Sequence, residues 1–205
     1  MGFNAVDILK FLEDKNLLDN KPLYWWPNAG TFEVVIGAVL TQNTTWKNVE
    51  KSLLNLKDFL HLEKFLILKE DEIKQKIKPS GFYNQKSKRL YNLARDIKKD
   101  FEDFDTFAKK VTREWLLSKK GIGEESADSI LCYGCFRDEM VIDAYTKRLL
   151  KKFDIEFKKY SQYKSFLQDG IKDSDILKNN YKNDLNLCFA RFHGMIVEYN
   201  KRNKI

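Results

Sequence analysis

Hydrophobic residues along the chain recur at the spacing of α-helices. Apolar side chains fall at every third or fourth position in four segments, namely residues 32–40, 46–56, 90–97 and 189–199. No sustained alternation of apolar and polar residues occurs, and no Asn-Gly or Asp-Gly hairpin joins two apolar runs. The pattern predicts an all-α fold with about nine to eleven short helices, because helices average about 11 residues.

Composition places the chain among globular proteins and points weakly to nucleic acid. Of its 205 residues 43% are hydrophobic, and 37 Lys and Arg stand against 30 Asp and Glu, a net charge of +7. Such a surplus favours a phosphate-bearing partner, although Lys-rich chains are often basic without one. The longest apolar run, Val34 to Leu40, is far shorter than the ~20 residues of a membrane span, so we expect no membrane partner.

The three cysteines favour a reduced, cytoplasmic protein over one held by disulfides. Cys132 and Cys135 form a C-x-x-C pair, but they lie in an apolar helical stretch and no second pair exists. We therefore predict buried structural cysteines rather than metal ligands. His193, one of only two histidines, is likewise expected to pack or hydrogen-bond.

Residues 112–150 hold the most informative pattern. Thr112 is predicted to cap a helix that stops at Gly121, and a second helix begins near Gly123. A Gly-x-Gly turn between helices presents backbone N–H groups that suit a DNA phosphate, although an ordinary helix corner looks the same. The apolar triplet before Asp143 then brings a carboxylate to the start of another helix, where a simple N-cap is the plainer interpretation.

Taken together, these segments resemble the helix-hairpin-helix and Gly/Pro…Asp signature of the endonuclease III superfamily of DNA glycosylases. Leu40–Thr44, Ser80–Lys86 and Ala190–Gly194 resemble further elements of that family in the same order, over about residues 25–200. The resemblance implies a two-lobed fold with the active-site cleft between the lobes. Residues 1–28 and 143–205 would form one lobe, and residues 29–142 the other, with the helix-hairpin-helix at about 112–133.

Two departures from the family pattern narrow the chemistry. Glu125 stands where strand-cleaving members carry a Schiff-base lysine, and a carboxylate cannot form an imine, so no AP-lyase activity is expected. No cysteine follows Cys188, so the four-cysteine iron–sulfur cluster is absent. We expect no cofactor and no metal site, although the resemblance leaves room for a monovalent cation at the hairpin.

An aromatic group points to the substrate. Within the superfamily, Trp25, Trp26, Pro27, Trp46 and Glu125 are most similar to the pocket of the small bacterial 3-methyladenine DNA glycosylases of the endonuclease III type. That resemblance implies excision of alkylated purines in base excision repair. Aromatic residues would sandwich the flipped, cationic base, with a cation–π gain of ~0.5–2 kcal/mol.

The resemblance also implies the remaining roles. Asp143 would be catalytic, stabilising an oxocarbenium-like sugar and assisting the attack of water. Gln42 would fill the vacated base stack and Phe82 would help to unstack the duplex. The other predicted DNA contacts lie at the hairpin, namely Lys119, Lys120, Gly121, Gly123 and Ser126. The expected protein is a monomer acting on double-stranded DNA that contains damaged bases.

Two other functions fit parts of the pattern. A glycosylase of the same superfamily that acts on mismatched or deaminated bases would share Asp143 and the hairpin, but its pocket would be more polar than three tryptophans suggest. A non-catalytic helix-hairpin-helix module would bind phosphates in the same way. Such a module has no need of a carboxylate after residues 140–142.

Overall fold

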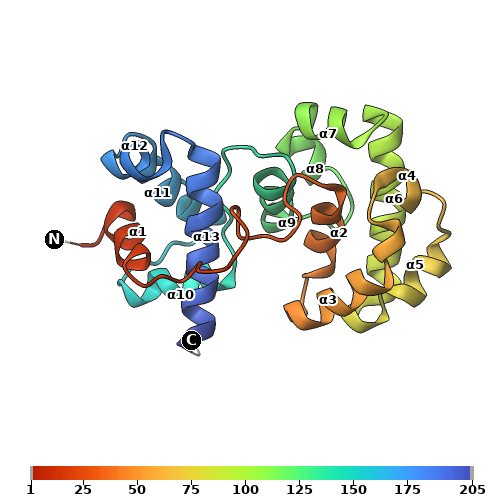
Figure 1. The fold of residues 1–205 in the computed structure, drawn as a ribbon, viewed down its shortest axis with the longest axis horizontal. Helices are drawn as coiled ribbons and strands as arrows, with labels where there is room; N and C mark the ends of the chain where they lie inside the picture. The colour runs from red at the N-terminus through yellow and green to blue at the C-terminus, as the bar shows by residue number, and fades with distance from the viewer. Residues whose placement is uncertain (1, 204–205) are drawn as a thin grey trace. The chain divides into compact units, whose positions relative to one another are not determined.

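The computed structural model describes residues 2–203, and these contain helices and no β-strand. The chain divides into two compact units, which Figure 1 shows with their helices labelled. Unit 1 comprises Met1–Pro27 and Phe136–Ile205, and unit 2 comprises Asn28–Cys135. The predicted lobe 29–142 therefore extended too far, because residues 136–142 group with unit 1. Met140 and Ile142 pack in the hydrophobic core of that unit.

Thirteen α-helices occur in residues 2–203, more than the pattern predicted. Unit 1 holds α1 (Ala5–Glu13), α10 (Ala144–Lys152), α11 (Tyr160–Lys172), α12 (Asp175–Tyr181) and α13 (Leu185–Arg202). Unit 2 holds α2 (Phe32–Leu40), α3 (Trp46–Asn55), α4 (Leu62–Phe65), α5 (Glu70–Lys76), α6 (Tyr83–Phe101), α7 (Phe104–Lys110), α8 (Arg113–Leu117) and α9 (Glu124–Ser129). Two 3-10 turns, η1 (Lys57–Phe59) and η2 (Lys78–Ser80), and a π-helical turn, η3 (Ile130–Gly134), complete unit 2. The extra helices are the short ones, which cannot repeat an apolar period along their length.

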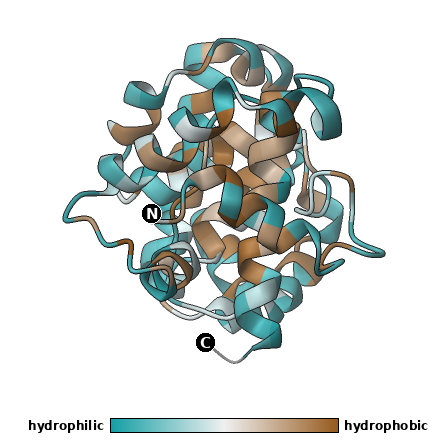
Figure 2. Cartoon of the chain, turned by 90° about the vertical axis from the view of Figure 1, so that its left-hand side faces the viewer, coloured by the Kyte–Doolittle hydropathy of each residue, from teal (hydrophilic) through white to brown (hydrophobic). Residues whose placement is uncertain are grey.

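Helix α13 is the centre of unit 1. Phe189, Phe192 and Ile196 on it are fully buried, and it packs against α1, α10 and α12. Figure 2, which looks onto this part of the chain, shows brown hydrophobic stretches and teal hydrophilic ones on the same helices. Among the apolar residues of α13, His193 is also buried. A buried polar side chain on a core helix needs a polar partner, and for His193 that partner is Asp143.

Helix α2 is the centre of unit 2. Eight of its nine residues are buried, so it is enclosed on all sides rather than amphipathic. It packs against α3, α6, α9 and η3. Its C-terminal end delivers Thr41 and Gln42, while the same core holds Leu116 of α8 and Ala127 of α9. The hydrophobic core of unit 2 therefore holds the hairpin helices α8 and α9 and the end of α2 in place.

Candidate functional site

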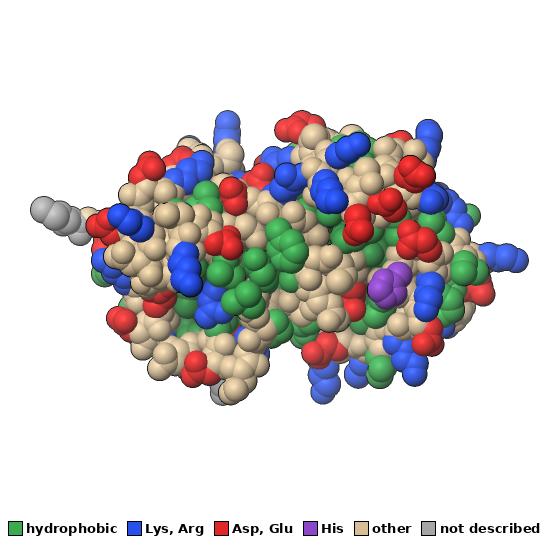
Figure 3. All heavy atoms as spheres, turned by 45° about the horizontal axis from the view of Figure 1, so that its top comes forward, with side chains coloured by type: hydrophobic (Ala, Val, Ile, Leu, Met, Phe, Trp, Pro, Cys, Tyr) green, Lys and Arg blue, Asp and Glu red, His purple; other side chains and the backbone are tan. Residues whose placement is uncertain are grey.

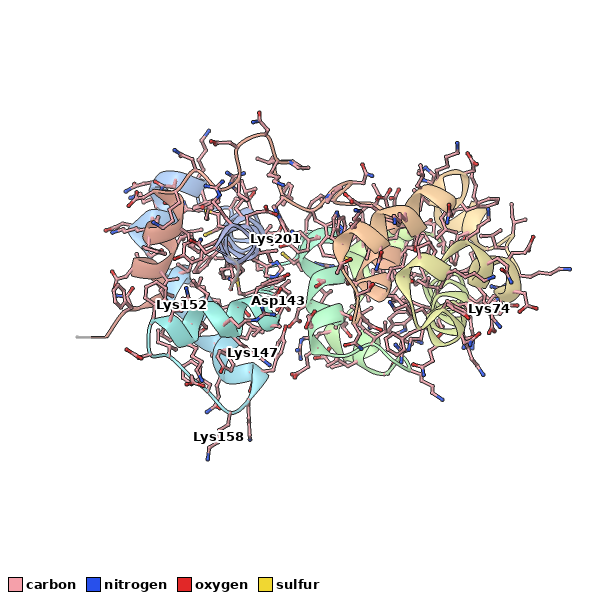
Figure 4. All side chains as sticks on the ribbon, turned by 90° about the horizontal axis from the view of Figure 1, so that it is seen from below. Lys74, Asp143, Lys147, Lys152, Lys158 and Lys201 are labelled. Atoms are coloured by element: carbon pink, nitrogen blue, oxygen red, sulfur yellow. The ribbon has the colours of Figure 1, made fainter. Side chains whose placement is uncertain are left out.

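Asp143 is the N-cap of α10, as the plainer interpretation of the sequence required. Its Oδ1 accepts hydrogen bonds from the backbone N–H of Thr146 at 2.7 Å and from the Thr146 hydroxyl at 3.0 Å. The three apolar residues before it are buried and anchor the start of the helix. Figure 4 labels Asp143 at this end of α10. Capping uses one carboxylate oxygen and leaves the other for a second contact.

That second contact is with His193 of α13. The Nε2 atom of His193 lies 3.4 Å from Oδ2 of Asp143, and the side chain of Asp143 is only 14% exposed. Burial acts to raise the pKa of Asp143, but the charge that the His193 imidazole can carry and the hydrogen bonds from His193 and Thr146 outweigh burial and hold the pKa below its usual value. Asp143 is therefore an oriented carboxylate that is ionised at neutral pH.

Trp25 also packs against His193. The two rings meet edge to face with centroids 5.5 Å apart, and the Trp25 indole N–H donates to Glu198 at 3.1 Å. Trp25 has a left-handed backbone, with φ of +64°. A Cβ atom at Gly194 would lie 2.5 Å from Cγ of Trp25, so only glycine admits the indole there. The structure thus brings together Asp143, which the sequence singled out, Trp25 and a histidine for which the sequence suggested no catalytic link.

The other residues of the predicted aromatic run differ from Trp25. Trp26 is 6% exposed, so most of its surface packs inside the protein. Its ring meets that of Trp25 edge to face at 6.3 Å. Pro27, in contrast, is exposed. Of these three residues, Trp25 has the ring that is both held by neighbouring side chains and partly open to solvent.

The hairpin of unit 2 follows the predicted pattern closely. Thr112 caps α8 by accepting a hydrogen bond from the Trp115 N–H, and Gly123 is the N-cap of α9. Gly121 has φ of +85°, a conformation that favours glycine. Gly123 has an extended backbone that any residue adopts, with open space around it. The turn therefore needs glycine at position 121, whereas at position 123 glycine leaves the backbone uncovered.

Gln42 is bound to this hairpin in the structure. Its amide Nε2 donates to the Gly121 carbonyl at 3.0 Å and to the Ser126 hydroxyl at 2.9 Å. Its Oε1 accepts from Arg89 at 2.6 Å. Arg89 covers Gly121 so closely that a Cβ there would lie 2.1 Å from Nε. Sequence reasoning missed Arg89, which lies on α6 and has no spacing relation to the Gly-x-Gly turn.

The two lysines before the turn have different surroundings. Lys119 Nζ lies 3.1 Å from Asp96 and 3.6 Å from Asp100, and 4.0 Å from the centre of the Trp115 ring. Lys120 is exposed. Figure 3 shows Lys and Arg interspersed with Asp and Glu on the face that it draws, rather than one uniform basic field. Lys120 is therefore better placed than Lys119 to meet a phosphate.

A buried ion pair joins the two helices of the hairpin. Arg113 Nε of α8 lies 2.7 Å from Asp128 Oδ1 of α9, and the Asp128 side chain is fully buried. Arg113 also lies 3.4 Å from Glu124. Removing one partner of such a pair leaves a buried charge without compensation. This pair links the two hairpin helices, and the sequence pattern did not reveal it.

Phe82 lies on an exposed and constrained turn. Its side chain is 60% exposed, and its backbone is left-handed with φ of +45°. Behind it, the buried amine of Lys86 donates to the carbonyls of Leu40 and Ser80, both at 2.8 Å. Burial, with the nearby charge of Arg89, lowers the pKa of Lys86 to about 8. Lys86 thereby ties the end of α2, just before Gln42, to the turn that carries Phe82.

The two remaining predicted pocket residues both belong to unit 2. Trp46, at the start of α3, packs partly against the core, and its indole N–H donates to Glu50 at 2.9 Å. Glu125 is exposed in the first turn of α9. The predicted roles of Trp46 and Glu125 in the base pocket stay predictions.

No metal centre is built from the residues that the structure describes. Cys132, Cys135 and Cys188 are buried, and none of the three forms a disulfide bond. No group of three or more His, Cys, Asp or Glu within residues 2–203 is arranged to hold a metal ion. At the hairpin, the carbonyls of Lys119 and Gly121 already accept hydrogen bonds from Ile122 and Gln42. The monovalent cation that the resemblance allows at the hairpin stays a prediction.

The helices within residues 2–203 include none that is both long and apolar enough to cross a membrane. The longest, α6 and α13, carry charged residues throughout their lengths.

Comparison with known proteins gives a consistent set of relatives. A crystal structure of Helicobacter pylori 3-methyladenine DNA glycosylase bound to 1,N6-ethenoadenine is 43% identical, with a TM-score of 0.90 over 98% of this chain and 99% of that one. A protein of Methanocaldococcus jannaschii, named as a candidate DNA repair glycosylase, is 41% identical over 187 residues, 87% of this chain and 80% of its own. An endonuclease III–DNA covalent intermediate shares the fold, with a TM-score of 0.74 at 14% identity over 98% of this chain and 87% of that one.

The family follows from the same comparison. The HhH-GPD superfamily of base excision DNA repair proteins matches residues 36–172, a range that runs from α2 through the hairpin and Asp143 to α11. The all-helical fold and the predicted superfamily are thereby confirmed. The chain belongs to the HhH-GPD superfamily of base excision DNA repair proteins and is a DNA glycosylase.

Proposed function

We propose that this glycosylase excises alkylated purines, 3-methyladenine foremost, from double-stranded DNA, with Asp143 as the catalytic residue. The observation that carries the proposal is that His193 contacts both the oriented, ionised carboxylate of Asp143 and the half-buried ring of Trp25. The H. pylori relative named as a 3-methyladenine DNA glycosylase supports the substrate class, since it is 43% identical over almost the whole chain.

The positive charge of the substrate explains why the carboxylate of Asp143 and the ring of Trp25 are sufficient for release of the base. A purine methylated at N3 is cationic while attached to the sugar, and it leaves with the bonding electron pair as a neutral base. No strong general acid is then needed. An electron-rich indole such as Trp25 stabilises the bound cation by ~0.5–2 kcal/mol. We infer that Trp25 supplies this face, with Pro27 beside it in sequence, while the buried Trp26 supports the run.

Asp143 acts on the sugar. As the glycosidic bond breaks, positive charge develops on the deoxyribose, and a carboxylate in a largely water-excluded place stabilises it strongly. Water then adds its oxygen to C1′ and loses a proton, for which Asp143 is the acceptor. Both carboxylate oxygens are held before the reaction, Oδ1 by Thr146 and Oδ2 by His193, so little reorganisation is needed.

Unit 2 supplies the DNA-binding residues in this proposal. The exposed backbone at Gly123 and the exposed Lys120 suit a phosphate. Exposed Phe82 suits insertion between bases, and Gln42 suits the vacated stack once it leaves its hydrogen bonds with the hairpin. Trp46 and Glu125 are retained as pocket residues on the sequence resemblance alone.

We further propose that the protein releases the base without cutting the strand and without a cofactor, acting as a monomer. Glu125 at the lysine position of strand-cleaving members supports the first point, because a carboxylate forms no Schiff base. The location that we infer is the cytoplasm, at the nucleoid, where the DNA substrate is found.

The test is base release from duplex DNA treated with a simple methylating agent, with free bases separated by chromatography. Wild-type protein and Asp143→Asn are compared, and the DNA is examined for nicks. We expect release of 3-methyladenine without nicking, and a loss of about 100-fold or more in the variant. Absence of any methylated base among the products would reject the substrate class. Undiminished release by Asp143→Asn would reject the catalytic role.

A further inference from the structure

His193 stands between the two groups to which the proposed function assigns chemistry. Its imidazole meets Asp143 Oδ2 through Nε2 at 3.4 Å and the Trp25 ring edge to face at 5.5 Å. It comes from α13, whereas Asp143 precedes α10 and Trp25 lies in the segment before α2. Three separate segments of unit 1 therefore meet at one buried ring.

The next residue of α13 completes the arrangement. Gly194 leaves the space that Trp25 fills, since a Cβ atom there would lie 2.5–2.9 Å from three carbons of that side chain. The Trp25 indole N–H is held by Glu198, which lies one helical turn after Gly194. One face of α13 thus positions Trp25 by shape and hydrogen bonding, and Asp143 by charge.

The carboxylate needs this support. Asp143 is largely buried, and burial disfavours its charged form. Thr146 stabilises Oδ1 with two hydrogen bonds, but both reach the same oxygen. Oδ2 faces His193. Without the imidazole, Oδ2 would lose its nearest side-chain nitrogen, and the carboxylate would gain freedom to rotate about its last bond.

We propose that His193 is a positioning residue for base release: its imidazole holds Oδ2 of Asp143 and keeps that carboxylate ionised, while the His193–Gly194 step sets Trp25 beside it. The proposal rests on the proposed function, because it deepens the role of Asp143. It assigns His193 no contact with the substrate.

Other charged groups around α13 have partners of their own. From the neighbouring elements, Glu13 of α1 accepts from Tyr181 of α12, and Lys21 lies 3.6 Å from Glu198. On α13 itself, Lys201 lies 3.3 Å from Glu198. Three cations of α10 lie over aromatic rings, namely Lys147 over Tyr163, Arg148 over Tyr145 and Lys152 over Tyr199, and the fourth, Lys151, lies 3.2 Å from Glu156. Asp143 is a charged group that the structure places against the His193 ring.

Two variants separate charge from orientation. His193→Gln keeps a side-chain N–H that can donate to Oδ2 but removes the imidazole's capacity to carry a positive charge, and His193→Leu removes both. Cys188→Ala is the matched control, because Cys188 is fully buried on the same helix and has no part in the site. It reports what a loss of packing in α13 does by itself.

The first measurement needs no activity: the carboxyl carbon of Asp143 is followed by NMR as the pH is lowered. In the wild type the pKa lies below its usual value, so the carboxylate stays ionised to low pH. In His193→Gln, burial is opposed only by Thr146, and the pKa should rise. The stability that the ionised Asp143 contributes is then lost at a higher pH than in the wild type, because it disappears as the pH falls through the folded-state pKa.

The second measurement is single-turnover release of methylated base against pH. We expect the acid limb of the His193→Gln profile to move to higher pH while its plateau rate stays closer to wild type. His193→Leu should lose about 10-fold to 100-fold at the plateau, the range expected for a misplaced catalytic group. Cys188→Ala should lower the melting temperature and leave the profile unchanged.

An unchanged Asp143 titration in His193→Gln, or wild-type release by His193→Leu, would overturn the proposal. The NMR result stands whether or not Asp143 is catalytic. Failure of the proposed function would show instead as undiminished base release by Asp143→Asn.

Discussion

The carboxylate of unit 1 and the hairpin of unit 2 are built in opposite ways. Asp143 is held by side chains, namely Thr146 of its own helix and His193 of the distant α13, and it is largely buried. The hairpin presents its backbone at a turn, and that turn is exposed at Gly121 and Gly123. Stabilising a developing positive charge requires a group shielded from water. Holding a phosphate requires only accessible N–H groups in the right geometry.

The difference decides how each region should respond to change. A substitution near Asp143 should alter the rate of chemistry through charge and packing. A substitution at the hairpin should alter the affinity for DNA through backbone geometry and phosphate contacts. Four predictions test this difference between the two regions.

The largest effect is expected where the hairpin itself depends on a buried charge. Arg113→Met should destabilise the protein by about 3–5 kcal/mol, because it leaves the fully buried Asp128 without its cation. Urea unfolding measures the change. The matched control is Lys151→Ala, which removes an exposed ion pair with Glu156 and should cost about 0–1 kcal/mol. Equal costs for the two variants would show that the Arg113–Asp128 pair does not hold the hairpin together.

At the unit 1 site, Gly194→Ala should displace Trp25 while leaving Asp143 in place. The new Cβ would lie 2.5 Å from Cγ of Trp25, so the ring must move, at a cost of about 1–3 kcal/mol in stability. We expect base release to fall by about 100-fold and tryptophan fluorescence to change. In the control, Gly134→Ala, the new Cβ meets Val34 at an ordinary 3.5 Å. Normal release by Gly194→Ala would remove Trp25 from the base-binding role.

At the hairpin, Gly121→Ala and Gly123→Ala should differ. Alanine at position 121 must adopt φ of +85° and displace Arg89, a strain of about 1–3 kcal/mol. We expect DNA affinity to fall about 10-fold or more, with a single-turnover rate at saturating protein that stays within a few-fold of wild type. Gly123→Ala has an extended backbone and open space, so its effect should be smaller. A binding titration orders the three proteins, and equal affinities would contradict the account of the turn.

The smallest effect separates the two lysines before the turn. Lys120→Ala should weaken DNA binding and reduce the slope of log affinity against log salt by about 1, as expected for the loss of one phosphate contact. Lys119→Ala should leave the slope nearly unchanged, because its amine already lies beside Asp96 and Asp100. The reverse order would place Lys119 on the phosphate instead.

How much could be predicted from the sequence follows the same division. The turn at Gly121 and the N-cap at Thr112 could be predicted, because turns and helix caps favour particular residue types at fixed local positions. The place of Asp143 at the start of a helix was predictable from the apolar triplet before it, whereas its catalytic role comes from the family resemblance and stays a prediction. Arg89 and the pairing of Asp143 with His193 were not, because they join residues far apart in the chain and nothing in their spacing reveals it.

Burial was the other property that the sequence could not supply. Trp25 and Trp26 are neighbours with the same side chain, yet only Trp26 is nearly enclosed. Lys119 and Lys120 differ in a similar way, because Lys119 forms ion pairs with two aspartates of α6 whereas Lys120 is exposed. In each pair the two side chains are the same and adjacent in sequence, so tertiary packing alone decides which one can contact DNA or a base.

The most direct test of the central claim compares two duplexes under single-turnover conditions. One carries a methylated, cationic purine, and the other carries a thymine or uracil mismatched with guanine. The account predicts that the wild-type protein releases the cationic purine at least about 100-fold faster, because Trp25 and an ionised Asp143 both favour positive charge. Equal or faster release of the mismatched pyrimidine would contradict it and indicate a mismatch glycosylase on the same fold.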